Sequence, residues 1–113
     1  MSAQYDMTID KSATFVKNIT WKENGTPINL EFYDAIFTIK TSPSSDEKIL
    51  EISTDSTGDD YVEIDGTSGI IEIIISPETT TTLAFDLAYY DLLLTDPDGL
   101  VTKLLRGRVS INE

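Results

Sequence analysis

Apolar and polar side chains alternate along most of this chain, which is the pattern of β-strands that bury one face. The alternation is clearest over residues 13–21, where Phe15, Ile19 and Trp21 share one face with Lys17. Lys17 is the one charged member of that face, and its long stem can lie along apolar surface while the ammonium reaches water. Strands are predicted over residues 5–9, 13–21, 35–41, 49–53, 61–64, 70–75, 89–95 and 100–111.

The segment from residue 70 to residue 82 departs from simple alternation. Residues 70–75 read Ile-Ile-Glu-Ile-Ile-Ile, so we expect a central strand with both faces at least partly covered. Ser76 then predicts a helix N-cap, with Pro77 at the first helical position and Glu78 in the first turn. The threonines at 79–82 form helix poorly, so we expect one or two turns and no other helical element.

Turn-forming residues separate the strands at intervals of roughly 8 to 12 residues. Asn24-Gly25 is a strong hairpin signal, because both residues tolerate positive φ. Asp96-Pro97-Asp98-Gly99 suits a type I turn, and Gly107 inside the last strand indicates a bulge. About seven or eight short strands with such turns are typical of an all-β sandwich or barrel. A length of 113 residues corresponds to one domain, 1–113.

Composition and charge mainly exclude classes of function. The 20 Asp and Glu residues against 8 Lys and Arg give a formal charge of -12, which repels nucleic-acid phosphates and anionic lipid. The absence of Cys and His removes thiolate sites, the usual general base and every Ser-His-Asp arrangement. A sandwich this short also lacks long loops to build a cleft. We therefore expect no enzyme activity, no catalytic residue, no cofactor, and neither a nucleic-acid nor a membrane partner.

Acidic residues gather between positions 54 and 65, and carboxylates crowded on loops can hold calcium. The candidate ligands are Asp55, Asp59, Asp60 and Asp65. Their spacing matches no complete calcium loop, so a solvated acidic loop is the favoured interpretation.

Aromatic and basic residues supply the candidate partner contacts. Most aromatic side chains are expected in the core, but Tyr89 and Tyr90 are adjacent on a strand, so one of them must face outward. The last strand holds the only local concentration of basic residues, which can pair with its own sheet or with an acidic neighbouring copy. The candidate contacts are Tyr5, Tyr89, Tyr90, Lys103, Arg106 and Arg108.

A further pattern of packing and turn residues runs through nearly the whole chain. It comprises Trp21-Lys22, Gly25, Pro27-Ile28, Leu30, Tyr33, Ala35, Ile39-Lys40, Gly69-Ile70, Ile73, Ile75-Ser76, Thr82-Leu83, Tyr90-Asp91-Leu92, Leu94-Thr95-Asp96-Pro97-Asp98-Gly99, Val101, Leu104-Leu105, Gly107 and Val109. This pattern resembles small virion proteins of tailed bacteriophages. The resemblance implies a single immunoglobulin-like β-sandwich, similar to the N-terminal domains of baseplate or receptor-binding proteins. Those relatives tend to have Gly where Asp86 stands and an aromatic where Ala88 stands, so the entry to the strand at 89–95 differs here.

The resemblance implies a non-enzymatic structural subunit of the phage particle that acts through contacts with other virion proteins in a symmetric, multi-copy assembly. It would be made in the host cytoplasm and be located in the virion. Because the chain ends soon after the domain, we expect a stand-alone subunit rather than a fibre. A tail, baseplate or fibre-attachment adaptor and a capsid decoration protein remain open. The alternatives are a carbohydrate- or receptor-binding sandwich that uses an outward aromatic, and a calcium-stabilised adhesive domain.

Overall fold

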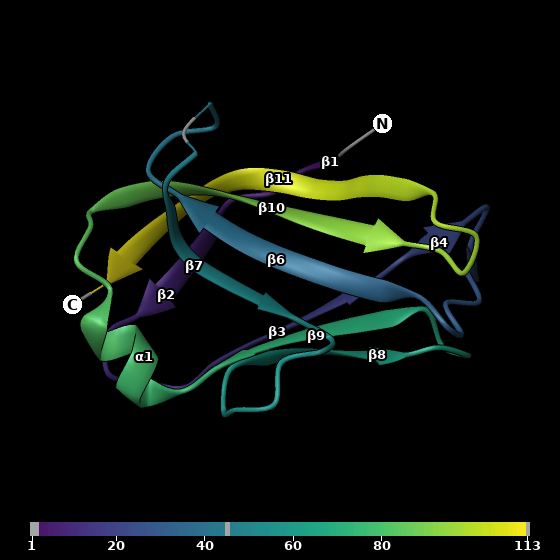
Figure 1. Ribbon diagram of the computed structural model, residues 1–113, viewed down its shortest axis with the longest axis horizontal. Helices are drawn as coiled ribbons and strands as arrows, with labels where there is room; N and C mark the ends of the chain where they lie inside the picture. Colours follow the sequence, from purple (N-terminus) through teal and green to yellow (C-terminus); the bar gives the residue numbers. More distant parts are fainter. Residues whose placement is uncertain (1–2, 45, 113) are drawn as a thin grey trace.

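A computed structural model describes residues 3–44 and 46–112, and almost all of this chain is strand and connecting loop. The larger sheet has six strands, in the order β1-β11-β10-β6-β7, with β2 also paired to β11. Its strands are β1 (Ala3–Gln4), β2 (Met7–Asp10), β6 (Asp34–Lys40), β7 (Lys48–Ser53), β10 (Leu87–Thr95) and β11 (Val101–Asn112). Figure 1 shows this sheet as the upper layer, above a smaller sheet.

The smaller sheet has three antiparallel strands in the order β3-β9-β8. They are β3 (Phe15–Thr20), β8 (Tyr61–Asp65) and β9 (Ile70–Ile75). The expectation of a central strand at 70–75 is confirmed: β9 lies between the other two, with Ile71, Ile73 and Ile75 fully buried. The isoleucines on its other face are partly buried.

Two further strands form a separate hairpin, β4 (Lys22–Glu23) and β5 (Thr26–Pro27). Its turn residues Asn24 and Gly25 have φ values of 54° and 81°, so the hairpin expected from Asn-Gly is confirmed. The all-β class is confirmed, but the expected count of seven or eight strands is too low. Among residues 3–44 and 46–112 there are eleven, because this hairpin adds two and the N-terminal strand is divided in two.

The core lies between the two sheets and follows the alternation of the sequence. Along β10, Ala88, Tyr90, Leu92 and Leu94 are buried, and each intervening residue after Leu87 is only partly exposed on the outer face. The inward face of β3 is the one expected, including Lys17, whose side chain is partly buried. Its ammonium donates a hydrogen bond to the Tyr5 hydroxyl (2.6 Å) and lies 4.5 Å from the centre of the Tyr5 ring.

The N-terminal segment lies along the edge of the larger sheet, parallel to β11. It is interrupted at Tyr5 and Asp6, opposite Gly107. A Cβ atom at Gly107 would clash with the Tyr5 carbonyl oxygen and lie 2.8 Å from its carbon. The expected bulge at Gly107 is therefore wrong, because the register between β10 and β11 shifts at Leu92/Leu93. The missing side chain at Gly107 instead leaves room for the backbone of Tyr5.

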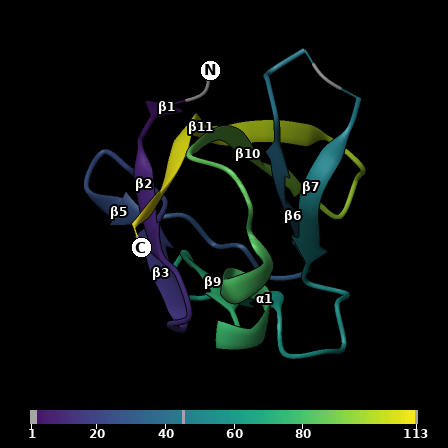
Figure 2. The ribbon, with the colours of Figure 1, turned by 90° about the vertical axis from the view of Figure 1, so that its left-hand side faces the viewer.

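The expected short helix is α1 (Pro77–Thr82), and it is the one helix in the described part of the chain. The Ser76 hydroxyl caps it by accepting a hydrogen bond from the Thr79 backbone N–H (3.3 Å). The buried Thr80 hydroxyl donates to the Ala13 carbonyl oxygen (2.9 Å), which ties the helix to the segment before β3. Figure 2 looks onto the end of the molecule where α1 lies, in front of β9. At six residues, it is far too short to cross a membrane, and the described residues contain no helix that could.

Candidate partner-binding face

The outer face of the larger sheet gathers cations around one outward tyrosine. Tyr90 points into the core, so its neighbour Tyr89 points outward. Sheet register places Tyr89 directly between Arg108 on β11 and Lys40 on β6. Lys40 is in turn paired with Lys48 on β7. This row therefore carries three cations and a tyrosine from four strands.

The next two rows of the same face add two more cations. Asp91 lies between Arg106 and Thr38, and Leu93 lies between Lys103 and Ile36. We name this outer surface the basic face. Its cations, five of the eight Lys and Arg residues in the chain, are Lys40, Lys48, Lys103, Arg106 and Arg108. These cations are concentrated on one surface of a protein whose formal net charge is -12.

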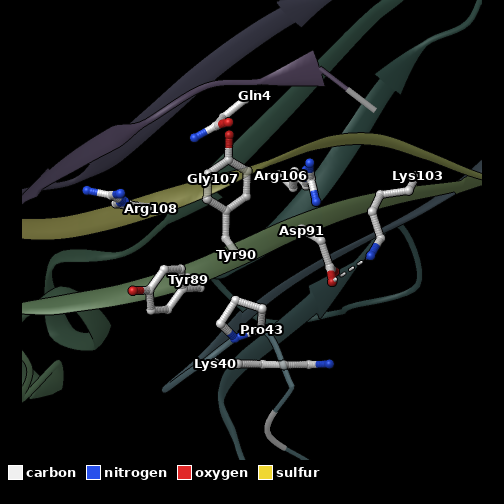
Figure 3. A pocket seen from close by; sticks show the side chains of 10 residues that line it. All are labelled: Gln4, Lys40, Pro43, Tyr89, Tyr90, Asp91, Lys103, Arg106, Gly107 and Arg108. Atoms are coloured by element: carbon white, nitrogen blue, oxygen red, sulfur yellow. Dashed lines mark ion pairs between the residues drawn. The ribbon is translucent and has the colours of Figure 1, made fainter. Parts of the chain in front are cut away.

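A hollow of about 320 Å³ opens on the basic face. Figure 3 shows its lining, with Tyr89, Arg106 and Arg108 on two neighbouring strands, Gln4 on one side and Lys40 on the other. Asp91 is the one carboxylate in the lining, and it faces Lys103 at 3.9 Å. Guanidinium and ammonium groups donate hydrogen bonds to carboxylates and other anions, and a tyrosine ring adds apolar contact area. The arrangement is therefore suited to binding an anionic group.

Among the residues that the structure describes, three of the five cations of the basic face form no ion pair. The other two are paired, Lys103 with Asp91 and Lys48 with Glu51, the latter at 2.7 Å. Over residues 3–44 and 46–112, no ion pair involves Lys40, Arg106 or Arg108. The basic residues of the last strand were expected to pair either with their own sheet or with an acidic neighbouring copy. Lys103 pairs within its own sheet, with Asp91, whereas Arg106 and Arg108 form no ion pair among the described residues.

The structure brings five of the six candidate contact residues together. Tyr89, Tyr90, Lys103, Arg106 and Arg108 all line the hollow. Tyr90 is itself 4% exposed, and its hydroxyl donates to the Tyr5 carbonyl oxygen (2.5 Å). Burial, assisted by the negative charge of Asp6, raises the pKa of Tyr90 above its ordinary value of 10.0. Tyr90 is therefore a neutral structural residue, and Tyr89 is the member of the pair that can touch a partner.

Tyr5 lies apart from the hollow. Its side chain is 42% exposed and is held by Lys17 of β3. Its backbone carries the carbonyl that Tyr90 binds. Tyr5 thus connects the N-terminal segment to both sheets, a role that the sequence did not indicate.

The candidate calcium ligands are not gathered into a metal-sized group. Among the residues that the structure describes, no cluster of three or more Asp, Glu, His or Cys side chains could hold an ion. Asp60 instead accepts hydrogen bonds from the Ser76 backbone N–H (2.7 Å) and the Thr79 hydroxyl (2.5 Å). Partial burial raises the pKa of Asp60, but these hydrogen bonds outweigh it and hold the pKa below its ordinary value of 3.8. Its carboxylate anchors the start of α1.

Sequence reasoning missed several residues of the surface. Lys40, Lys48 and Gln4 join the basic face only through strand pairing, because they are far in sequence from Arg106. Phe32 belongs to an aromatic set expected mostly in the core, yet it is 84% exposed and has a φ of 66°. None of these four positions carries a local sequence signal for its place on the surface.

Comparison with known proteins adds no family: no protein-family model matches the chain, and no curated protein matches it significantly.

Proposed function

We propose that this protein is a non-enzymatic structural subunit of a tailed-phage particle that works by binding other virion proteins. The observation that carries the proposal is the basic face, because it is an extended surface with unpaired arginines and an outward tyrosine rather than a deep catalytic cleft. Arginine and tyrosine are enriched where proteins bind one another. The packing and turn pattern that resembles small phage virion proteins is the second support.

We further propose that the fold is immunoglobulin-like. In such sandwiches one sheet holds strands G, F and C, with C′ added in the variable type, and the other holds B, E and D. The order β11-β10-β6-β7 corresponds to G-F-C-C′, and β3-β9-β8 corresponds to B-E-D. The short helix between β9 and β10 then occupies the connection between E and F.

The test of the proposed function is the composition of purified particles. We expect mass spectrometry of phage particles purified from a host that expresses this chain to detect it in many copies per particle. A cryo-electron density map should then place the sandwich at the tail, baseplate, fibre attachment point or capsid surface. Absence of the chain from purified particles, while it is present in the infected cell lysate, would contradict the proposal.

A second candidate function is supported by Tyr89. An outward aromatic ring flanked by Arg108 and Lys40 can contact a sugar ring while the cations bind its acidic substituent. We expect such a module to bind acidic glycans measurably and to lose binding in Tyr89→Ala. A screen of acidic and neutral glycans that yields no binding would exclude this alternative and leave the structural function unaffected.

A further inference from the structure

The outer face of the smaller sheet carries charge of the opposite sign. Glu63 on β8 stands directly opposite Glu72 on β9, and Asp65 lies two residues further along β8. These three carboxylates and Asn18 line a second hollow, of about 570 Å³. We name this surface the acidic face.

No cation on the same sheet balances these carboxylates. β8 and β9 contain no Lys or Arg, and Lys17 on β3 points to the other side, where it binds Tyr5. In the described part of the chain, no ion pair involves Glu63, Asp65 or Glu72. Like charges placed directly opposite each other destabilise a strand pair. The Glu63–Glu72 pair therefore has an electrostatic cost that an external cation would relieve.

The basic and acidic faces lie on opposite sides of the same core. Each sheet turns its buried residues towards the other sheet, so the two outer faces point away from one another, as the two layers of Figure 1 show. Each face also offers apolar contact area. Ile36 and Leu93 lie on the basic face, and Val16 and Ile74 lie on the acidic face. Val16 is 53% exposed.

We propose that the basic face of one copy docks on the acidic face of a second copy, so that Arg106 and Arg108 meet Glu63 and Glu72. The proposal rests on the proposed function, since it names a second copy of this chain as one partner in the assembly. The contact is head-to-tail, so a docked pair still has one free basic face, on one copy, and one free acidic face, on the other, to which further copies can bind. Repetition builds a ring if the rotation between copies closes, or an open filament if it does not.

The size of the faces is adequate for a specific contact. The molecule measures 37 × 27 × 25 Å, so one sheet face approaches the roughly 800 Å² that each partner contributes to a standard interface. The net charge of -12 repels copies at long range. At about 0.15 M salt the screening length is roughly 8 Å, so that repulsion is weakened while groups in direct contact still attract.

A charge-swap experiment tests the docking. Sedimentation velocity at about 0.15 M salt should show concentration-dependent association of the natural protein, weakened at about 1 M salt. The variants Arg106→Glu/Arg108→Glu and Glu63→Lys/Glu72→Lys should each associate at least about tenfold more weakly. Mixed in equal amounts, the two variants should associate again, because every basic face of one then meets an acidic face of the other.

Matched controls separate this contact from net charge and from misfolding. Lys11→Glu/Lys22→Glu and Glu23→Lys/Asp98→Lys change the net charge by the same amounts at positions outside both faces, so each should associate about as strongly as the natural protein. Circular dichroism checks that every variant is folded. A natural protein that stays monomeric, variants that associate normally, or folded variants without rescue on mixing would each overturn the docking. The experiment uses the protein alone, so its failure leaves the virion test of the proposed function standing.

Discussion

At the scale of single residues, two positions are set by backbone geometry rather than by side-chain chemistry. Gly107 lies beside Tyr5 of the N-terminal segment, which runs parallel to β11. A Cβ added at Gly107 would clash with backbone atoms of Tyr5. Phe32 has a φ of 66°, a conformation that costs a residue with a Cβ roughly 1 kcal/mol. Both positions therefore give predictions that do not depend on which partner the protein binds.

Gly107→Ala should destabilise the protein by about 2–4 kcal/mol, because the N-terminal segment must move away from β11. That movement breaks the Tyr90–Tyr5 hydrogen bond and exposes the buried Met7 and Ile9. Thermal unfolding measures the loss, and hydrogen exchange should rise first in residues 3–10. Gly58→Ala is the control, since no atom lies within 4 Å of its added Cβ. Equal stability of the two variants would show that the strand does not depend on Gly107.

Phe32→Asn should stabilise the protein by about 0.5–1 kcal/mol, because Asn accepts positive φ more readily and the exposed ring contributes little packing. Chemical denaturation gives the free energy of unfolding. Leu100→Asn removes an exposed apolar side chain at a position without positive φ and should leave stability nearly unchanged. A loss of stability in Phe32→Asn would mean that the ring makes contacts that outweigh the backbone strain.

At the scale of elements, α1 depends on a carboxylate from the loop before β8. The Asp60 carboxylate accepts hydrogen bonds from the Ser76 backbone N–H and the Thr79 hydroxyl. Ser76 and Thr79 lie at the start of the helix. The cap itself was predictable from Ser76-Pro77, because capping is local. The role of Asp60 was not, because 16 residues separate it from Ser76 and the sequence shows it only as one of several acidic loop residues.

Asp60→Ala should destabilise the protein by about 1–2 kcal/mol near neutral pH, through the loss of two hydrogen bonds to a charged acceptor. The folded protein lowers the pKa of Asp60, so the unfolded state binds the proton more tightly. The contribution of Asp60 is therefore fully present above about pH 4 and is lost as the pH falls through its lower folded-state pKa. Unfolding curves of both proteins between pH 3 and pH 7 should converge at the acidic end.

Asp59→Ala, which removes the neighbouring exposed carboxylate, is the matched control for Asp60→Ala and should change stability little. A stability difference between the natural protein and Asp60→Ala that does not shrink on acidification would contradict a role for the ionised carboxylate.

At the scale of the whole molecule, charge is separated between two outer faces while the total remains strongly acidic. The isoelectric point is about 4.1. Near that pH the long-range repulsion between copies disappears, and solubility should be lowest. Light scattering between pH 3 and pH 8 should therefore rise sharply around pH 4. A featureless profile across this range would show that net charge does not control association of the protein.

Local patterns in the sequence predicted where most of the strands, one hairpin turn and the helix lie. Alternation located the strands and the inward face of β3, Asn24-Gly25 located the hairpin turn, and Ser76-Pro77 located the helix. These features depend on neighbouring residues alone: side-chain direction has a period of two in a strand, and positive φ and helix caps are local properties. Local patterns could not predict that the N-terminal strand is divided into β1 and β2, because the division lies where the Tyr5 backbone packs against Gly107 of a distant strand.

Only the tertiary structure decided which residues form the candidate site. The sequence singled out Lys103, Arg106 and Arg108 because they are close along the chain, but Lys40 and Lys48 join them through the register of β6, β7 and β10. The choice between Tyr89 and Tyr90 also required the direction of β10 relative to the core. Strand pairing brings together residues more than 50 positions apart, and no local pattern encodes that register. The separation of charge onto two opposite faces follows from the same cause.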